Sequence, residues 1–384
     1  MTNFEKSSFS VKYILLGEQH FQNPEDIFFS KIHVVYQGVS FDDWAKSFHT
    51  RGEFRANSVD EQRISIQYTL GIPVRAEVNG NYIITLFSKP IRLRPSLEVR
   101  ETYIKEVPCF EIKSLKGKRL HNYIEANNVL RDFLNFIIPE EVHIKSIYGI
   151  MENKNDSQGN IVPLKGEQEV QIFYRWNVSD MFKPKRNQPI FPRDTFEPEP
   201  REVQFERYLK KWFELSKEPI INLYCGMMFN PDMYIEHLFL GLAFAIDSYH
   251  RTFIRKKSPE KQLHEQELKR IASLLPQQAD KDRLLEITKN SFNRSIKDMV
   301  KDLYHEYHSL GDSLFKHKGE EEFSEKVKAT RNYFSHGSEG SMKNVILGED
   351  LTFLTMDVQL LLQFCILTQL DFSKDHIIRI FDPT

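Results

Sequence analysis

The sequence predicts an α+β protein with two domains. We expect an N-terminal antiparallel β-sandwich or barrel-like domain with a covering helix, followed by a C-terminal all-α helical bundle. Between Val11 and Trp176, apolar residues mostly alternate with polar ones, which is the pattern of half-buried strands. After Phe205 they recur every three or four residues, as they do in amphipathic helices. A proline-rich stretch separates the two patterns.

The composition is that of an ordinary soluble globular protein. The chain has 384 residues, enough for two cores, with 40% hydrophobic and 28% charged residues. Its formal net charge is −2 and its isoelectric point is about 6.7. A chain with this balance does not coat nucleic acid through bulk charge, so any contact with RNA must be local.

Cysteine usage and the N-terminal sequence predict a cytoplasmic location. Cys109, Cys225 and Cys365 lie far apart and form no Cys-x-x-Cys pair, which suggests buried thiols in a reducing compartment. The first ten residues lack the basic and then apolar layout of a signal peptide. No run of about 18 apolar residues is present, so we expect no membrane partner.

A β-hairpin is the clearest element of the N-terminal half. Asn79-Gly80 lies between two apolar segments, and this dipeptide suits a tight turn because both residues tolerate positive φ. We expect one helix, which Pro139 ends. The predicted strands are 64–70, 74–78, 82–87, 97–107, 142–150 and 170–176, and the predicted helix covers 120–137.

The proline-rich stretch 180–200 is predicted to be a linker between the domains. It contains five prolines, which disfavour both helix and strand, and a basic cluster that we expect to be solvated. The expected domains are therefore 1–179, a regulatory or sensing domain, and 201–384, a helical domain. The first carries no phosphate loop, glycine-rich dinucleotide fingerprint or metal-ligand cluster, and in the second His305 and His308 could bind a metal but no third ligand follows at a recognisable spacing, so we expect no cofactor and no metal.

Beyond the linker the pattern predicts a bundle of at least five helices. Their apolar residues form stripes at helical spacing, and the broadest stripe belongs to a long helix after Pro231. The segment Lys316-His317-Lys318 is predicted to be solvated charge. The expected helices cover 205–215, 232–255, 259–274, 281–307, a helix from Glu322 onward, and 350–369.

Three residues near the end of the helix from Glu322 are candidate catalysts. Asn332 and His336 are four apart and share a helix face, and Arg331 has an arm long enough to reach them. Gly337 is well placed to end the helix at a left-handed residue. An imidazole, a guanidinium and an amide can together perform phosphodiester chemistry without a metal.

The residues Arg331, Asn332 and His336 resemble the R-N-x-x-x-H form of the R-x(4–6)-H motif of HEPN domains. This family of helical-bundle proteins includes many metal-independent endoribonucleases. The layout of a β-rich half followed by such a bundle is similar to HEPN proteins of the ApeA type, which act in bacterial anti-phage defence.

The resemblance implies an activity and partners. His336 would exchange protons with the RNA 2′-OH or the leaving oxygen, Arg331 would hold the scissile phosphate, and Asn332 would orient one of the two. The family implies a homodimer formed through the HEPN-like domain, an RNA substrate with tRNA as one candidate, and abortive infection started by a phage-derived trigger.

Two questions stay open at the level of sequence. Asp247 and His250 on an earlier helix are placed to support the Arg331–His336 pair, but Asp247 could equally form a local ion pair with Arg251, four residues on. The bundle could also be a catalytically inactive HEPN-like binding or scaffold module, with the β-rich domain as a ligand-binding sandwich.

Overall fold

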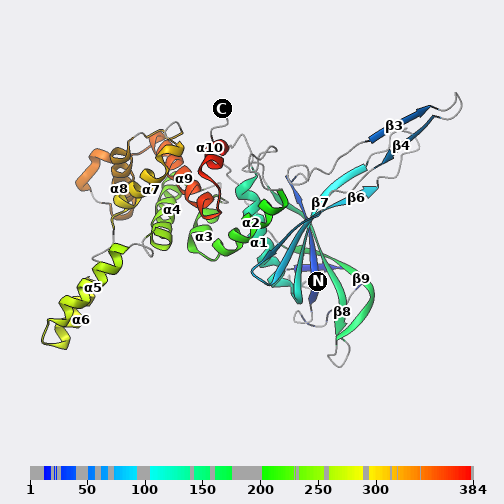
Figure 1. The fold of residues 1–384 in the computed structure, drawn as a ribbon, viewed down its shortest axis with the longest axis horizontal. Helices are drawn as coiled ribbons and strands as arrows, with labels where there is room; N and C mark the ends of the chain where they lie inside the picture. Colours follow the sequence, from blue (N-terminus) through cyan, green and yellow to red (C-terminus); the bar gives the residue numbers. More distant parts are fainter. Residues whose placement is uncertain are drawn as a thin grey trace, which may run out of the picture. The chain divides into compact units, whose positions relative to one another are not determined.

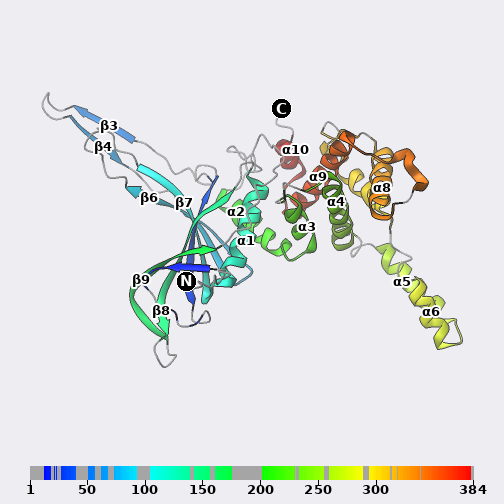
Figure 2. The ribbon, with the colours of Figure 1, turned by 180° about the vertical axis from the view of Figure 1, so that it is seen from behind.

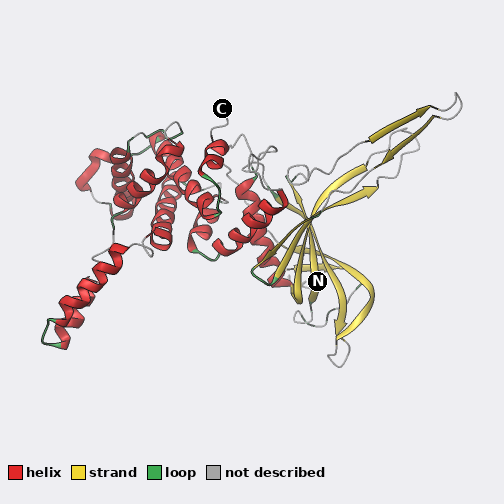
Figure 3. Cartoon of the chain, in the orientation of Figure 1, coloured by secondary structure: helices red, strands yellow, loops and turns green. Residues whose placement is uncertain are grey.

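The computed structural model confirms the predicted fold class: strands come first and every described element from residue 201 onward is a helix (Figure 3). Its backbone divides into two compact units, one of residues 1–179 with 183–214 and one of residues 180–182 with 215–384. The structure describes residues 13–18, 21, 23, 27–39, 51–56, 62–67, 73–92, 104–138, 142–155, 161–174, 201–228, 230, 233–254, 259–288, 294–311, 314–317, 319–337 and 339–381. The predicted linker 180–200 lies outside them.

Seven strands of the first unit form one antiparallel sheet in the order β1-β9-β8-β2-β7-β6-β5, and β3 and β4 form a separate pair. All predicted strands have counterparts; of the segment predicted at 97–107, residues 97–103 lie outside the described residues and the rest belongs to β7. The strands are β1 (Tyr13–Leu16), β2 (Phe28–Gln37), β3 (Arg51–Ala56), β4 (Gln62–Gln67), β5 (Val74–Val78), β6 (Tyr82–Arg92), β7 (Ile104–Arg119), β8 (His143–Asn155) and β9 (Ile161–Tyr174).

The predicted hairpin between β5 and β6 is confirmed. Asn79 and Gly80 have φ of 53° and 60°, the positive values that a two-residue turn of this kind requires. Val78 then pairs with Tyr82, which sets the register of the two strands.

The helix α1 (Leu120–Ile137) covers one face of the sheet (Figures 1 and 2). Beneath it lies a buried row that runs across the paired strands and includes Leu86, Phe110, Val34 and Ile147. A hydrogen bond fixes the helix above this row: the Tyr123 hydroxyl donates to the Ser30 carbonyl at 2.7 Å. The face is thus a single apolar core between sheet and helix.

The opposite face of the sheet carries a polar cluster. His33 lies across from Glu111, and their side chains are 3.1 Å apart, while Lys31 approaches the same carboxylate at 3.2 Å. The hydrogen bond from His33, followed by that from Lys31, lowers the pKa of Glu111 to about 2. These polar groups satisfy one another on a face with no described helix over it.

The helix α2 (Arg201–Leu215) packs against α1 and belongs to the first unit. The Trp212 indole donates to the Val129 carbonyl at 3.0 Å and stacks on Phe136, with ring centroids 5.2 Å apart. Trp212 is fully buried in this contact, and the first unit extends to residue 214.

The second unit is an all-α bundle around α9, whose apolar residues are almost all buried. By length and composition α9 alone among the described helices could cross a membrane, but most of it is buried, as in a core helix. The helices are α3 (Pro219–Met228), α4 (Ile235–Tyr249) with a π-helical turn (His250–Ile254), α5 (Pro259–Ser273), α6 (Gln278–Thr288), α7 (Ile296–Gly311), α8 (Glu320–His336), a 3₁₀ helix (Glu339–Asn344), α9 (Glu349–Gln369) and α10 (Lys374–Phe381).

The helix predicted over 281–307 is wrong, because the chain forms α6 and α7 there instead. Ser295 begins α7 with a capping box: its hydroxyl accepts from the Asp298 N–H at 3.2 Å, and its own N–H donates to the Asp298 carboxylate at 3.3 Å. This reciprocal cap satisfies free backbone donors at the start of a new helix. The helices α3 and α10 were not predicted.

Candidate active site

The candidate site lies on the last two turns of α8. Glycines flank this helix: Gly319 precedes it with φ of 92°, and Gly337 ends it in the left-handed region with φ of 59°. The Gly337 N–H donates to the Tyr333 carbonyl at 2.9 Å. Three glutamates, Glu320 to Glu322, fill the first turn, where negative charge complements the helix dipole.

One face of α8 is buried, as the spacing predicts. Phe323, Val327 and Thr330 are all fully inaccessible to solvent. Near the C-terminal end, the Phe334 ring meets the edge of Phe239 on α4, with centroids 6.5 Å apart. This contact between the half-buried Phe334 and the buried Phe239 fixes the rotation of α8 and so decides which of its side chains face outward.

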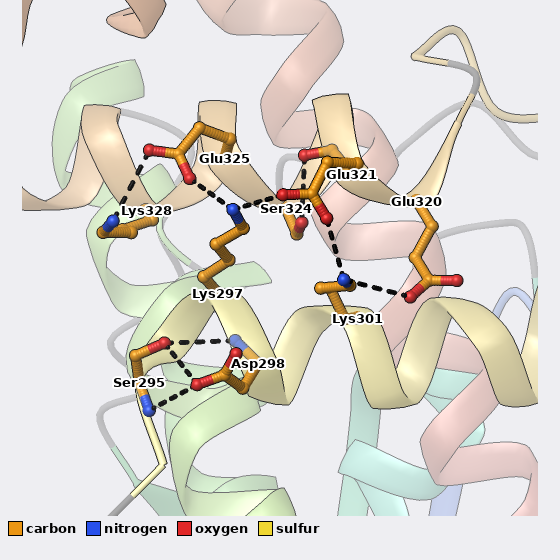
Figure 4. Close-up of polar contacts among 9 residues, drawn as sticks. All are labelled: Ser295, Lys297, Asp298, Lys301, Glu320, Glu321, Ser324, Glu325 and Lys328. Carbon is orange, nitrogen blue, oxygen red and sulfur yellow. Dashed lines mark hydrogen bonds and ion pairs between the residues drawn. The ribbon is translucent and has the colours of Figure 1, made fainter.

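Ion pairs with α7 support the N-terminal half of α8 (Figure 4). Lys297 binds Glu325 at 2.8 Å and also pairs with Glu321, while Lys301 binds Glu321 at 2.7 Å. The hydrogen bond from Lys297 to Glu321, and after it the one from Lys301, lowers the pKa of Glu321 to about 2. All these groups are near the surface, so the network orients the two helices more than it stabilises them.

The loop before α8 corrects one prediction. His317 was expected to be solvated, but its side chain is only 12% exposed, and its Nδ1 lies 2.8 Å from the Asp357 carboxylate of α9. Asp357 also accepts from the backbone N–H groups of Lys316 and His317. Because Asp357 ties down this loop, the start of α8 is fixed to α9.

The structure brings Arg331, Asn332 and His336 together. Arg331 Nη1 lies 3.1 Å from Asn332 Oδ1 and 3.4 Å from His336 Nε2. Because a guanidinium only donates, His336 Nε2 can take part in this contact only as the acceptor. His336 is exposed, and Arg331 and Asn332 are half-buried, so an incoming anion can reach all three side chains.

The Arg331 guanidinium also lies over an aromatic ring. Its Cζ is 5.7 Å from the ring centroid of Phe244 on α4, within cation–π range. Sequence reasoning missed Phe244, which lies off the buried stripe of α4 and is 46% exposed. Its only signal in the sequence is an aromatic residue on the polar face of a helix.

Asp247 and His250 have other partners. Asp247 Oδ1 accepts from Arg251 Nε at 2.8 Å, which is the local ion pair left open above. His250 is buried, and its Nε2 lies 3.0 Å from the carboxylate of Asp302 on α7, which also accepts from Arg294. His250 therefore braces the π-helical turn against α7, whereas Asp247 stays in a local ion pair with Arg251.

The chemistry available at the site is that of phosphate esters. A permanently charged guanidinium can bind a phosphate and stabilise added negative charge on its oxygens. An unprotonated imidazole nitrogen within reach of that guanidinium can take a proton from a hydroxyl group. Within the described part of the chain, no three His, Cys, Asp or Glu side chains are grouped as a metal site would require.

Comparison with known protein families gives two matches. Residues 1–212 match the family described as ApeA N-terminal domain 1, and residues 240–376 match the Apea-like HEPN family. The second match contains Arg331, Asn332, His336 and Phe244. No curated protein and no solved structure matches the chain.

The two matches agree with the structure. The first ends at Trp212, the residue of α2 that is buried against α1, and it covers more than half of the chain. The Apea-like HEPN family suggests a nuclease of anti-phage defence. With the β-sheet unit and the motif-bearing bundle both matched in order, the chain belongs to the ApeA family of HEPN proteins.

Proposed function

We propose that this protein is a metal-independent endoribonuclease that cuts cellular RNA by 2′-OH transesterification. The observation that carries the proposal is the convergence of Arg331, Asn332 and His336 on the exposed end of α8. RNA supplies its own nucleophile, so the enzyme needs only proton transfer and charge stabilisation.

Each residue has a separate role in this reaction. His336 Nε2 exchanges its hydrogen bond from Arg331 for one from the 2′-OH and takes the proton of that hydroxyl, whose oxygen attacks the adjacent phosphorus. Arg331 stabilises the negative charge that builds up on the phosphoryl oxygens. Asn332 accepts from Arg331 through Oδ1, which leaves its amide N–H groups for the phosphate. The P–O5′ bond then breaks, leaving a 2′,3′-cyclic phosphate and a 5′-hydroxyl.

The departing 5′-oxygen also needs a proton, and one imidazole cannot serve both ends of the bond at once. We propose a homodimer through the HEPN-like domain, in which the second His336 acts as the acid. The biological role proposed here is abortive infection in the cytoplasm. A phage-derived trigger would release cutting of cellular RNA, with tRNA as one candidate target, and the β-sheet unit would sense the trigger.

The test is to incubate the purified full-length protein with total cellular RNA in EDTA and to map new RNA ends. We expect the wild type to produce cyclic phosphate and 5′-hydroxyl ends, and Arg331→Ala and His336→Ala to produce none. The extract of infected cells is added in a parallel arm, in case the resting protein awaits its trigger.

Matched controls come from exposed residues of the same types elsewhere in the bundle. His305 on α7 and Arg270 on α5 are 78% and 63% exposed in their side chains, so His305→Ala and Arg270→Ala should cut RNA like the wild type. If the wild type cuts nothing in either arm, the catalytic proposal fails, and an inactive HEPN-like binding module becomes the better description.

A further inference from the structure

We propose that Phe244 is a positioning residue for Arg331: its ring holds the guanidinium toward His336 while leaving the positive charge free for the scissile phosphate. This inference rests on the proposed function and deepens it. Phe244 is on α4, 87 positions before Arg331 in the chain (331 − 244), and the two meet only because α4 packs on α8.

Exposure of one phenylalanine is ordinary and needs no explanation by itself. The informative observation is the guanidinium on its ring, 5.7 Å from Cζ to the centroid. Leu242, Ala245 and Ile246 next to it are fully buried and supply the packing of α4. Phe244 therefore points away from that core, and its ring is available to the Arg331 side chain.

The register between the two helices fixes this contact. The buried Phe239 meets the half-buried Phe334, and five residues later on α4 Phe244 meets Arg331, three residues earlier on α8. Opposite directions along the two helices mean that they run antiparallel. The contact of Phe334 with the buried Phe239 thus holds the outer pair, Phe244 and Arg331, in register.

No carboxylate is among the contacts that Arg331 makes with the described residues. In the described part of the chain they are the Asn332 amide, the His336 imidazole and the Phe244 ring. A carboxylate partner would orient the guanidinium but would compete with the phosphate for its charge. An aromatic face orients a cation and leaves its donors and its net charge available.

The ring also matters during the reaction. When His336 takes a proton from the 2′-OH, two cations are within hydrogen-bond distance of each other and repel. Asn332 is uncharged and does not offset this repulsion. Attraction of the guanidinium to the face of Phe244 keeps Arg331 at the phosphate at that moment, so the ring should act on kcat more than on KM.

The first test replaces Phe244 in the full-length protein by phenylalanines carrying one, two and three ring fluorines. Fluorine keeps the size and apolar character of the ring but weakens its negative face, so only the cation–π attraction changes. We expect kcat for RNA cutting to fall stepwise along the series, with a total loss of about 2- to 5-fold, the effect of an exposed cation–π contact. KM should stay nearly constant.

Natural residues provide the matched variants. Phe244→Leu should lower kcat at least as far as the most fluorinated ring, and Phe244→Tyr and Phe244→Trp should retain activity because they keep an aromatic face. If kcat does not change along the fluorine series while the wild type cuts RNA, the inference is wrong. Loss of the dimer in Phe244→Leu by light scattering would also overturn it, because Phe244 would then serve a contact between copies.

A second measurement does not depend on activity. The guanidinium Nε–H of Arg331, assigned by its absence in Arg331→Lys, should show a ring-current shift in the NMR spectrum that disappears in Phe244→Leu. If the shift is present but the wild type cuts no RNA, the contact is real and only the proposed function fails. If the shift is absent, Phe244 does not hold the guanidinium and the inference fails whatever the activity.

Discussion

The two ends of α8 differ in how they are held. At the N-terminal end, Phe323 is fully buried against Tyr304 and Phe315, and Asp357 ties down the loop that leads in. The C-terminal end carries the catalytic candidates, and the only fully buried residue of its last seven is Thr330. One helix thus combines a fixed end with an accessible one.

This difference explains how an exposed site can still be ordered. Rigidity is supplied by the buried half of the same helix and transmitted along its backbone, so the site itself does not need to be buried. Stability and activity should therefore respond to substitutions at opposite ends of α8. The predictions below test that separation, beginning with the largest effect.

Removing the anchor of the fixed end should cost the most. Phe323→Ala leaves a cavity among aromatic rings, and we expect a loss of about 3–5 kcal/mol in the free energy of unfolding of the helical unit. Urea denaturation followed by circular dichroism measures this loss. Phe353→Ala on α9, where the ring is 44% exposed, is the control and should cost far less.

The accessible end should behave in the opposite way. His336→Ala should change the free energy of unfolding by no more than about 0.5 kcal/mol, because the ring is exposed, while abolishing RNA cutting. Comparable losses of stability in His336→Ala and Phe323→Ala would show that the two ends of α8 are not distinct.

Thr330, between the two ends of α8, binds the segment that follows the helix. Its buried hydroxyl accepts from the Ile346 N–H at 3.0 Å. Thr330→Val keeps the shape but leaves this N–H without its acceptor, and we expect a loss of about 1–2 kcal/mol in stability by urea denaturation. Thr330→Ser keeps the hydroxyl; if it is as destabilised as Thr330→Val, the hydrogen bond is not the cause.

Much of this arrangement could be predicted from the sequence because it is local. Arg331, Asn332 and His336 lie on two turns of one helix, so their spacing alone places them together, and Gly337 marks the end of that helix. Asn79-Gly80 is local in the same way. The structure places the three side chains and the Asn79-Gly80 turn as predicted, because neither depends on a residue far away in the sequence.

What the sequence did not reveal depends on distant partners. His317 looks like a solvated charge until Asp357, 40 residues away, is placed beside it. The contact of Phe244 with Arg331 can be seen only once the register of α4 against α8 is known. The break between α6 and α7 had a local signal, Ser295 with Asp298 three residues later, but the continuous apolar spacing masked it.

The smallest effect should come from the surface ion pairs at the fixed end. Lys297, and after it Lys301, lower the pKa of Glu321 from its usual 4.5 to about 2. A carboxylate whose pKa is lower in the folded state stabilises the fold above a pH of about 4.5, and this contribution is lost as the pH falls through about 2. Glu321→Gln should therefore slightly lower the urea midpoint near neutral pH, and this deficit should shrink in high salt and vanish in acid, whereas Glu286→Gln on α6 should show no such dependence. A deficit in Glu321→Gln that persists unchanged in acid and in salt would mean that packing, and not charge, joins α7 to α8 at this point.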